Sequence, residues 1–181
     1  TERKTERKYV GQPLKRKEDP RLITGTGHYV DDIRIADLLH VEILRSEHAH
    51  ARIRSIDVST ARKAPGVAGV YTHADIAGLC GVFPAINAGI PDVKVPPRYP
   101  LAGGEVCFVG QPVAAVVSEG RYAARDAVEL IDVDYEPLPA VVDPEEAMRP
   151  GSPRAHTGLP DNVAFRWETK GGDLDDAFRK A

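Results

Sequence analysis

Two nearly continuous apolar runs lie next to each other in the second half of the chain, EVCFVG at 105–110 and PVAAVVSE at 112–119. A strand with one face in water alternates apolar and polar residues, whereas a strand buried on both faces is apolar throughout. The runs therefore predict two strands that are buried on both faces. The tripeptide GQP at 110–112 separates them and predicts a break that needs the backbone geometry of glycine.

The remaining pattern predicts short strands and short helices on both sides of a long loop. The loop, at 80–104, is rich in proline and glycine, and connections of that length usually carry function or contact a partner. Further strands are expected at 38–46, 51–58, 67–72 and 131–135, and helical segments at 60–64, 74–79, 121–130, 144–148 and 173–181. This order predicts an α/β fold of the α+β type, with a mixed sheet and short helices, and excludes a doubly wound parallel sheet.

Apolar residues within these segments define the expected packing faces. Leu39, Val41 and Ile43 alternate and share one face of the strand at 38–46. Ile53 and Ile56 are the apolar anchors of the following strand. In the helix at 121–130, the residues at helical spacing are Ala123, Ala127 and Leu130.

Polar residues mark the expected helix starts. Ser59 precedes the segment at 60–64, and Asp143 stands before Pro144, a residue favoured in the first helical turn. Asp173 is the expected N-cap of the last helix, with an apolar stripe at Leu174, Ala177 and Phe178. The sequence of that helix covers only about two turns, and a helix of this length is only marginally stable on its own. We therefore expect the sequence to be part of a longer polypeptide.

Length, charge and composition restrict the class of protein. A chain of 181 residues suits one domain, or one domain with a tail. Its 24 basic and 27 acidic residues are well mixed, which argues against a nucleic-acid partner. The apolar runs are too short to span a bilayer. The charged start, TERKTERKYV, lacks the apolar segment of a signal peptide, so a cytoplasmic location is expected.

The motif SEHAH raises the question of a metal site, because His48 and His50 lie two residues apart and would point to one face of an extended chain. His40 and Glu42 on the preceding strand are the available third ligands. A catalytic zinc site usually needs three protein ligands, and such a site would make the chain a metal-dependent hydrolase. Imidazoles at a strand end also bond backbone groups, and we favour this framework role, with no metal ligand assigned.

Other polar motifs do not assemble into an active site. Ser46 near His48 lacks the surroundings of a nucleophile elbow. Gly25-Thr26-Gly27 lacks the third glycine of a dinucleotide motif. Asp31 and Asp32 are adjacent, so on a strand they face opposite ways, and a turn or ion-pair role is favoured. No catalytic or cofactor-binding residue is assigned.

The two cysteines and two aromatic residues complete the candidates. Cys80 and Cys107 are too few for an iron–sulfur cluster or a structural zinc site by themselves, although one disulfide is possible. Cys107 lies in an apolar run, so a buried, inert thiol is expected. Phe165 and Trp167 stand in a polar tail, where they are either anchors for a partner surface or locally packed.

Five strings in order resemble one known family. EDPRLITGTGHYVDDI, SEHAHARIRSIDVSTARKAPGV, VGQPVAAVVSE, AVELIDVDYEPLPAVVDPEEAM and GDLDDAFRKA occur in this sequence from about Val10 to Ala181. They resemble the N-terminal α/β hammerhead domain in the large subunit of the xanthine dehydrogenase/aldehyde oxidase family. Within that family, YVDDI, GRYAARDA and FRWE are most similar to carbon monoxide dehydrogenase large chains.

The resemblance implies molybdenum chemistry outside these residues. In the family, a molybdenum ion on a pterin hydroxylates the substrate, and electrons pass through [2Fe–2S] clusters in a small subunit to FAD in a medium subunit. The pterin loops, the base glutamate and, in the carbon monoxide branch, a copper-binding cysteine lie downstream of the hammerhead. No family role therefore carries over to Cys80 or Cys107.

The resemblance also implies a division of the chain. We expect a mobile leader at 1–9, the hammerhead domain at 10–150 and a connecting tail at 151–181 that leads to the molybdenum cofactor domains. The expected function is a non-catalytic structural domain, with the rest of the large subunit and the two smaller subunits as partners. The alternative is a free-standing hammerhead module, a binding or scaffold protein without molybdenum chemistry. The substrate (CO, an aldehyde, a purine or another heterocycle) is left open.

Overall fold

The computed structural model describes residues 9–84, 90, 92–169 and 171–181. The chain divides into two compact units, Thr1–Leu38 and Leu39–Ala181, and each is described by itself. The expected leader at 1–9 lies almost entirely outside the described residues. The expected limits of the domain and of the tail stay a prediction.

The first unit contains the short helices α1 (Asp19–Ile23) and η1 (Val30–Asp32). None of its described residues is buried. The predicted turn role of Asp32 is confirmed, because its carboxylate accepts a hydrogen bond from the Tyr29 N–H over 2.9 Å at the start of η1. The buried core therefore belongs to the second unit.

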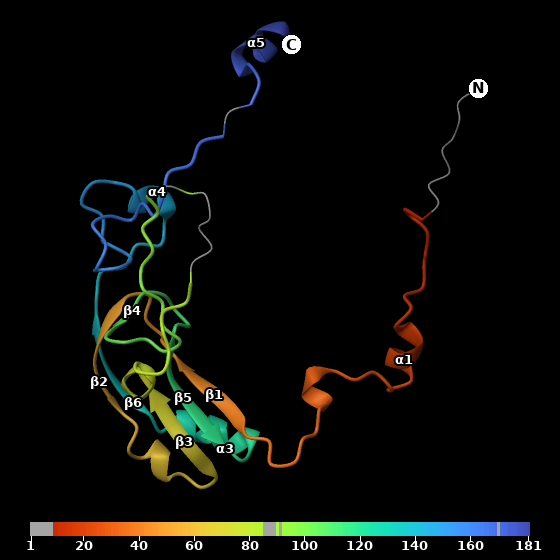
Figure 1. Cartoon of the computed structure of the whole chain (residues 1–181), viewed down its shortest axis with the longest axis vertical. Helices are drawn as coiled ribbons and strands as arrows, with labels where there is room; N and C mark the ends of the chain where they lie inside the picture. Colours follow the sequence, from red (N-terminus) through yellow and green to blue (C-terminus); the bar gives the residue numbers. More distant parts are fainter. Residues whose placement is uncertain (1–8, 85–89, 91, 170) are drawn as a thin grey trace. The chain divides into compact units, whose positions relative to one another are not determined.

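The second unit contains two three-stranded sheets (Figure 1). In the first sheet, β5 (Pro112–Ser118) lies between β1 (His40–Arg45) and β3 (Val67–Thr72). In the second sheet, β2 (Ala51–Asp57) lies between β4 (Glu105–Val106) and β6 (Asp132–Pro137). All the pairings between these strands are antiparallel. The structure confirms the expected strands. The strand at 67–72 has the expected ends, and those expected at 38–46, 51–58 and 131–135 have slightly different ends.

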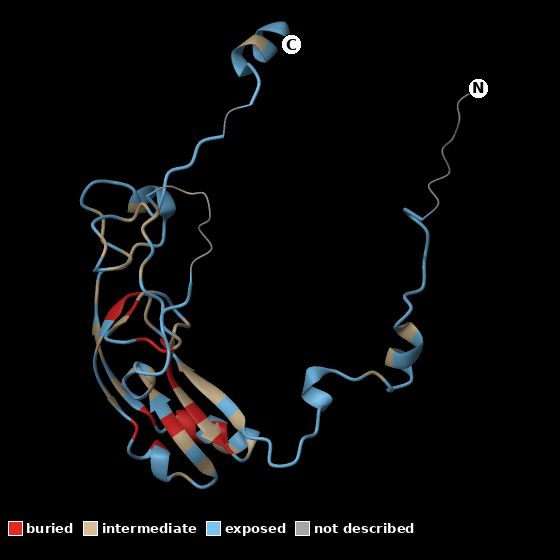
Figure 2. Cartoon of the chain, viewed as in Figure 1, coloured by how far each residue is buried: buried red, intermediate tan, exposed pale blue. Residues whose placement is uncertain are grey.

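The central strand β5 confirms the prediction from its apolar run. Val113, Ala114 and Val116 are fully buried, and the buried residues gather along this strand and its neighbours (Figure 2). Ala114 and Val116 pack into a core that includes residues of the helix α3 (Arg121–Val128), whereas Val113 packs into a second core with strands β2 and β4. Burial on both faces explains why this strand needs no polar alternation.

The two cores share residues of the second sheet. Ile56 and Val133 pack against both clusters of buried residues. Ile53 also packs against the second cluster, so both expected anchors of β2 are confirmed. The pairing of β2 with β6 shifts register between Ile53 and Ser55. One extra residue at this irregularity explains how two isoleucines three positions apart both reach the interior.

The inward face of β1 differs from the expected one. Leu39 and Val41 are 47% and 58% exposed, whereas Leu44 packs against the core. Alternation indicates a strand, but it does not reveal which face the neighbouring helix covers. Similarly, α3 buries Ala124, Ala127 and Val128. Leu130, the residue expected at its end, lies beyond the helix and is 44% exposed.

The strand predicted at 105–110 is wrong beyond Val106. The backbone turns after β4, because the Cys107 N–H donates to the Gln111 side chain over 2.7 Å and Gly110 donates to the Ser46 carbonyl over 2.8 Å. These bonds replace a strand ladder. Val109 is 65% exposed, so burial on both faces is wrong for this run.

The short helices begin directly after the predicted capping residues, with one exception. Asp143 accepts N–H bonds at the start of α4 (Pro144–Ala147), and Asp173 does so at the start of α5 (Leu174–Lys180). The exception is the 3₁₀ helix η2 (Ala61–Lys63), which begins after Thr60, not after Ser59. The turn α2 (His73–Ile76) precedes the loop at 80–104, whose described residues before β4 form no helix or strand. Residues 85–89 and 91 of that loop lie outside the described residues.

Candidate functional site

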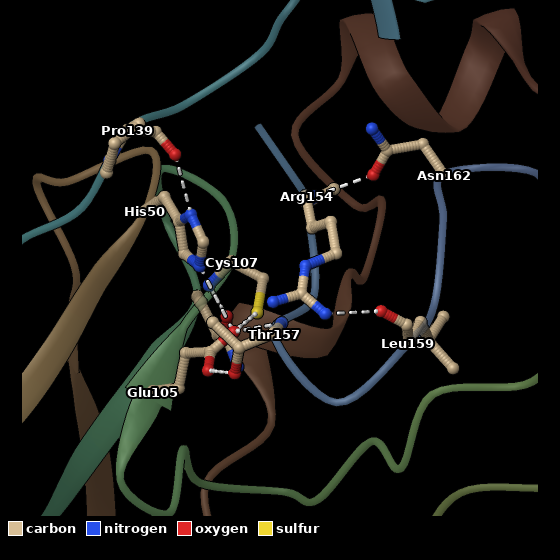
Figure 3. A network of polar contacts seen from close by, with 10 residues as sticks. His50, Glu105, Cys107, Pro139, Arg154, Thr157, Leu159 and Asn162 are labelled. Atoms are coloured by element: carbon tan, nitrogen blue, oxygen red, sulfur yellow. Dashed lines mark hydrogen bonds and ion pairs between the residues drawn. The ribbon is translucent and has the colours of Figure 1, made fainter. Parts of the chain in front are cut away.

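Glu105 is the centre of a polar cluster that joins three segments distant in the sequence (Figure 3). Glu105 begins β4, His50 immediately precedes β2, and Thr157 lies in the chain that follows α4. In the antiparallel pairing of β2 with β4, Ala51 pairs with Val106. Ala51 follows His50 in the chain, and Val106 lies between Glu105 and Cys107. Alternation then places Glu105 and Cys107 on one face, where the imidazole reaches them.

The carboxylate of Glu105 accepts hydrogen bonds through both of its oxygens. Oε1 lies 3.1 Å from His50 Nε2 and accepts from the Cys107 thiol over 3.2 Å and from the Thr157 N–H over 3.1 Å. Oε2 accepts from the Thr157 hydroxyl. On the other side of the ring, His50 Nδ1 lies 2.9 Å from the carbonyl oxygen of Pro139.

The ring of His50 is surrounded by acceptors. The residue is only 6% exposed, so these contacts replace water. Nδ1 faces the Pro139 carbonyl and Nε2 faces the Glu105 carboxylate, so each ring nitrogen has an oxygen within hydrogen-bond distance.

The cluster changes the proton affinities of two members in opposite directions. Burial by itself would raise the pKa of Glu105, but hydrogen bonds from Thr157, Cys107 and His50 stabilise the anion and lower its pKa to about 2. Burial, together with the adjacent Glu105 carboxylate, raises the pKa of Cys107 to about 12. Glu105 is therefore ionised and Cys107 is a neutral thiol at pH 7. The predicted inertness of this thiol agrees with its high pKa, although its neighbours are polar.

The segment beyond α4 is held by a second group of bonds. The amide nitrogen of Asn162 donates to the carbonyls of Ala147 and Pro153 over 3.0 and 2.8 Å, and its oxygen accepts from the Ala155 N–H over 2.8 Å. These bonds hold residues 147–162 together, and the contact of Thr157 with Glu105 attaches this segment to β4. The expected connecting tail is therefore joined to the sheet unit at its near end.

The same segment is joined to the long loop. The Lys94 ammonium contacts the Asp161 carboxylate at 2.7 Å, and the Lys94 N–H donates to the Ala164 carbonyl over 2.8 Å. The ion pair is partly exposed, so it stabilises the contact only weakly. Part of the loop at 80–104 and part of the tail thus lie side by side.

The structure separates the two histidines of the SEHAH motif. The His48 ring packs against Tyr135 with centroids 4.8 Å apart, whereas His50 binds Pro139 and Glu105. The framework role favoured for both histidines therefore agrees with their contacts. Glu42, one proposed third ligand, forms an ion pair with Arg125 at 3.0 Å.

The other candidate residues have ordinary local environments. The Ser46 hydroxyl donates to the His48 carbonyl over 3.0 Å and accepts from the His48 N–H, which is a backbone turn. Cys80 is exposed, and both cysteines are free, so the possible disulfide does not form. Trp167 is 75% exposed and Phe165 is 48% exposed.

The sequence pattern alone does not bring together His50, Glu105 and Cys107. The available signal is the spacing of Glu105 and Cys107 by two residues, which places both on one face of an extended chain. The contact with His50 depends on which strands pair, and no local pattern reveals that. These residues offer an imidazole nitrogen, a carboxylate oxygen and a thiol sulfur within 4.8 Å of one another, a donor set that can bind protons or a metal ion.

Comparison with known proteins identifies the fold. Residues 24–139 match the family described as aldehyde oxidase and xanthine dehydrogenase, a/b hammerhead domain. The chain belongs to this family. The α/β hammerhead fold with short helices is thereby confirmed. Among the residues that the structure describes, no helix has both the length and the apolar character needed to cross a bilayer.

Individual relatives place the hammerhead within large subunits. The carbon monoxide dehydrogenase large chain of Afipia carboxidovorans is 43% identical over 95% of this chain and 22% of its own length. The crystal structure of quinoline 2-oxidoreductase from Pseudomonas putida is similar with a TM-score of 0.76 and 44% identity, over 83% of this chain and 19% of that one. The crystal structure of the Cu,Mo-CO dehydrogenase is similar with a TM-score of 0.73 and 39% identity, over 94% of this chain and 22% of that one. The chain thus spans about a fifth of the length of these relatives.

Proposed function

We propose that this chain is the hammerhead portion of the large subunit of a molybdenum-dependent oxidoreductase, and that it supports the enzyme without carrying out the reaction. The observation that carries the proposal is coverage: the carbon monoxide dehydrogenase large chain of Afipia carboxidovorans matches 95% of this chain with only 22% of its own length. A supporting role is consistent with the polar cluster, whose donors and acceptors bind one another and the adjacent backbone.

The molybdenum cofactor is assigned to other parts of the subunit. The Thr157 N–H and hydroxyl and the Cys107 thiol already donate to Glu105, so these donors do not fit as a binding site for the ring of a pterin. The proposed partners are the remaining domains of the large subunit, a small [2Fe–2S] subunit and a medium FAD subunit. The proposed location is the cytoplasm.

Substrate choice is proposed to lie outside these residues as well. The relatives named for carbon monoxide and for quinoline are 43% and 44% identical to this chain. Carbon monoxide is a diatomic gas, whereas quinoline is a bicyclic aromatic heterocycle. A domain that is equally similar in both enzymes does not distinguish such different molecules, since specificity requires contacts that differ between substrates.

The mass of the natural polypeptide tests this proposal against the free-standing module. A tagged form would be purified from the encoding organism, and its mass and molybdenum content would be measured. We expect a polypeptide about four to five times as long as this chain, with about one molybdenum per polypeptide. A natural product of about 181 residues without molybdenum would support the free-standing module instead.

The isolated chain provides a second test. Expressed alone, these 181 residues are expected to fold, to contain no molybdenum and to oxidise neither CO, aldehydes nor purines. Activity would be measured with an artificial electron acceptor, and the full-length subunit with its partners would serve as the positive control. Turnover by the isolated chain would contradict a supporting role.

A further inference from the structure

Three potential metal ligands converge in the cluster around Glu105. His50 Nε2 and Cys107 Sγ lie 3.1 and 3.2 Å from the same oxygen, Glu105 Oε1. All three ligand atoms fall within 4.8 Å of one another. Figure 3 shows the ring, the thiol and the carboxylate turned toward one another. Ligands around a tetrahedral ion at bond lengths of about 2.0–2.3 Å are separated by roughly 3–4 Å, so only small movements are needed to admit one ion.

The types of donor atom identify the class of ion. Zinc is bound by imidazole nitrogen, thiolate sulfur and carboxylate oxygen, and sites with three protein ligands leave a fourth position for water. Magnesium and calcium require oxygen ligands, and the present set has only one such group. Soft or borderline divalent ions are therefore selected over hard ones.

The surroundings already hold each ligand in place. His50 Nδ1 lies 2.9 Å from the Pro139 carbonyl, and this contact directs Nε2 toward the cluster, as outer partners of metal-binding histidines usually do. The Thr157 hydroxyl binds Glu105 Oε2, which leaves Oε1 as the oxygen facing the other ligands. The Cys107 N–H is bound by the Gln111 side chain over 2.7 Å.

The charges of the three ligands match those of one divalent ion. Glu105 supplies a carboxylate, and Cys107, whose thiol now donates to that carboxylate, supplies a thiolate when its proton is displaced. With a neutral imidazole as the third ligand, the two negative charges balance the two positive charges of the ion. Binding therefore leaves no unbalanced charge in this half-buried site.

His156 is a further titratable residue beside the cluster. His156 interacts electrostatically with both Glu105 and His50, and Arg98 in turn interacts with His156. Burial is the main cause that lowers the pKa of His156, and the Glu105 carboxylate partly opposes this shift. His156 is therefore neutral at pH 7 and does not repel a cation.

We propose that His50, Glu105 and Cys107 form a binding site for one zinc-class divalent cation, with water as the fourth ligand. Binding breaks the Cys107 S–H bond, forms bonds to the ion from Cys107 Sγ, His50 Nε2 and Glu105, and releases the displaced thiol proton to solvent. The site is separate from the proposed molybdenum chemistry, because it needs only residues of this chain.

Titration of the purified 181-residue chain with Zn²⁺ and with Co²⁺ tests the site. We expect one ion per chain, release of at least one proton, from the Cys107 thiol, and tighter binding as the pH rises, because protons compete for the ligands. Calorimetry in two buffers with different ionisation enthalpies measures the protons. Bound Co²⁺ should show the absorption of a thiolate-to-cobalt transition, and Mg²⁺ should not compete. A cobalt spectrum without this transition would overturn the proposal.

Matched cysteine variants make the test specific. Cys107→Ser keeps a donor for Glu105, and its folding is verified by circular dichroism. Losing even an outer partner of a metal ligand costs about 10- to 100-fold in affinity, so losing the thiolate should weaken Zn²⁺ binding at least as much. Cys80→Ser changes an exposed thiol and should leave the affinity unchanged. Equal binding by Cys107→Ser would mean adventitious binding elsewhere and would overturn the site, as would full affinity in Glu105→Gln.

Discussion

Thr157 donates both its backbone N–H and its hydroxyl to the carboxylate of Glu105, a residue 52 positions earlier in the chain. The two bonds engage both oxygens of one side chain, which His50 and Cys107 also contact. A single carboxylate thus connects a strand end, a turn and the segment beyond α4. The stability of these connections depends on the charge of Glu105.

Removing the Thr157 hydroxyl should loosen the segment beyond α4. Thr157→Val keeps the shape of the side chain but removes one hydrogen-bond donor to an ionised acceptor. We expect the free energy of unfolding to fall by about 1 kcal/mol and not by more, because the site is partly exposed. Hydrogen exchange of residues 151–162 should accelerate more than that of β5. Thr60→Val is the control, since the Thr60 side chain makes no capping bond. Equal exchange rates in both variants would contradict the role of Thr157.

Acid should destabilise the protein through Glu105. Its pKa is lowered from 4.5 to about 2 on folding. A carboxyl with a depressed folded-state pKa contributes stability that is complete above pH 4.5 and is lost as the pH falls toward 2. After allowance for partial exposure, we expect a contribution of about 2 kcal/mol at neutral pH.

Glu105→Gln tests this pH dependence, because glutamine does not titrate. Urea unfolding between pH 2.5 and pH 7 should show a smaller loss of stability in the variant than in the parent chain. Glu129→Gln, which changes an exposed carboxylate directly after α3, is the matched control. Parallel pH profiles for the parent and Glu105→Gln would rule out the stabilising role of the ionised carboxylate.

Gly110→Val should destabilise the turn between β4 and β5. Gly110 has φ +87°, and apart from its two chain neighbours no residue has an atom within 4 Å of the position that a Cβ would occupy. The cost therefore arises from backbone conformation, not from a clash. A β-branched residue in this region costs about 1–3 kcal/mol. Gly81→Val is the control, because Gly81 has open space and no left-handed φ. Thermal melts followed by circular dichroism should separate the two, and similar melting temperatures would refute the conformational argument.

Trp167→Ala should affect assembly more than folding. The side chain is 75% exposed, so the free energy of unfolding of the isolated chain should change by less than about 0.5 kcal/mol. If Trp167 anchors a partner surface in the full enzyme, truncation should weaken association of the subunits or domains by more than about 1 kcal/mol. Sedimentation of the full-length subunit with its partners measures this. Unchanged affinity would leave Trp167 as a surface residue without a binding role.

Several features were determined by local sequence. The run at 112–118 is apolar enough to specify a strand buried on both faces, and β5 is that strand. Asp143 and Asp173 cap α4 and α5 as expected, because a capping side chain bonds N–H groups only two or three residues away. Gly110 has a left-handed φ, in agreement with the expectation that the break between the two apolar runs needs the backbone geometry of glycine.

Only the tertiary structure decided how these elements meet. It ended β4 at Val106, since hydrogen bonds to Gln111 and Ser46 turn the chain there. It also brought Glu105 to His50 and Thr157, which are 55 and 52 residues away. Capping and apolar alternation act over a few residues and can be read locally, whereas these contacts depend on which strands pair and in which register.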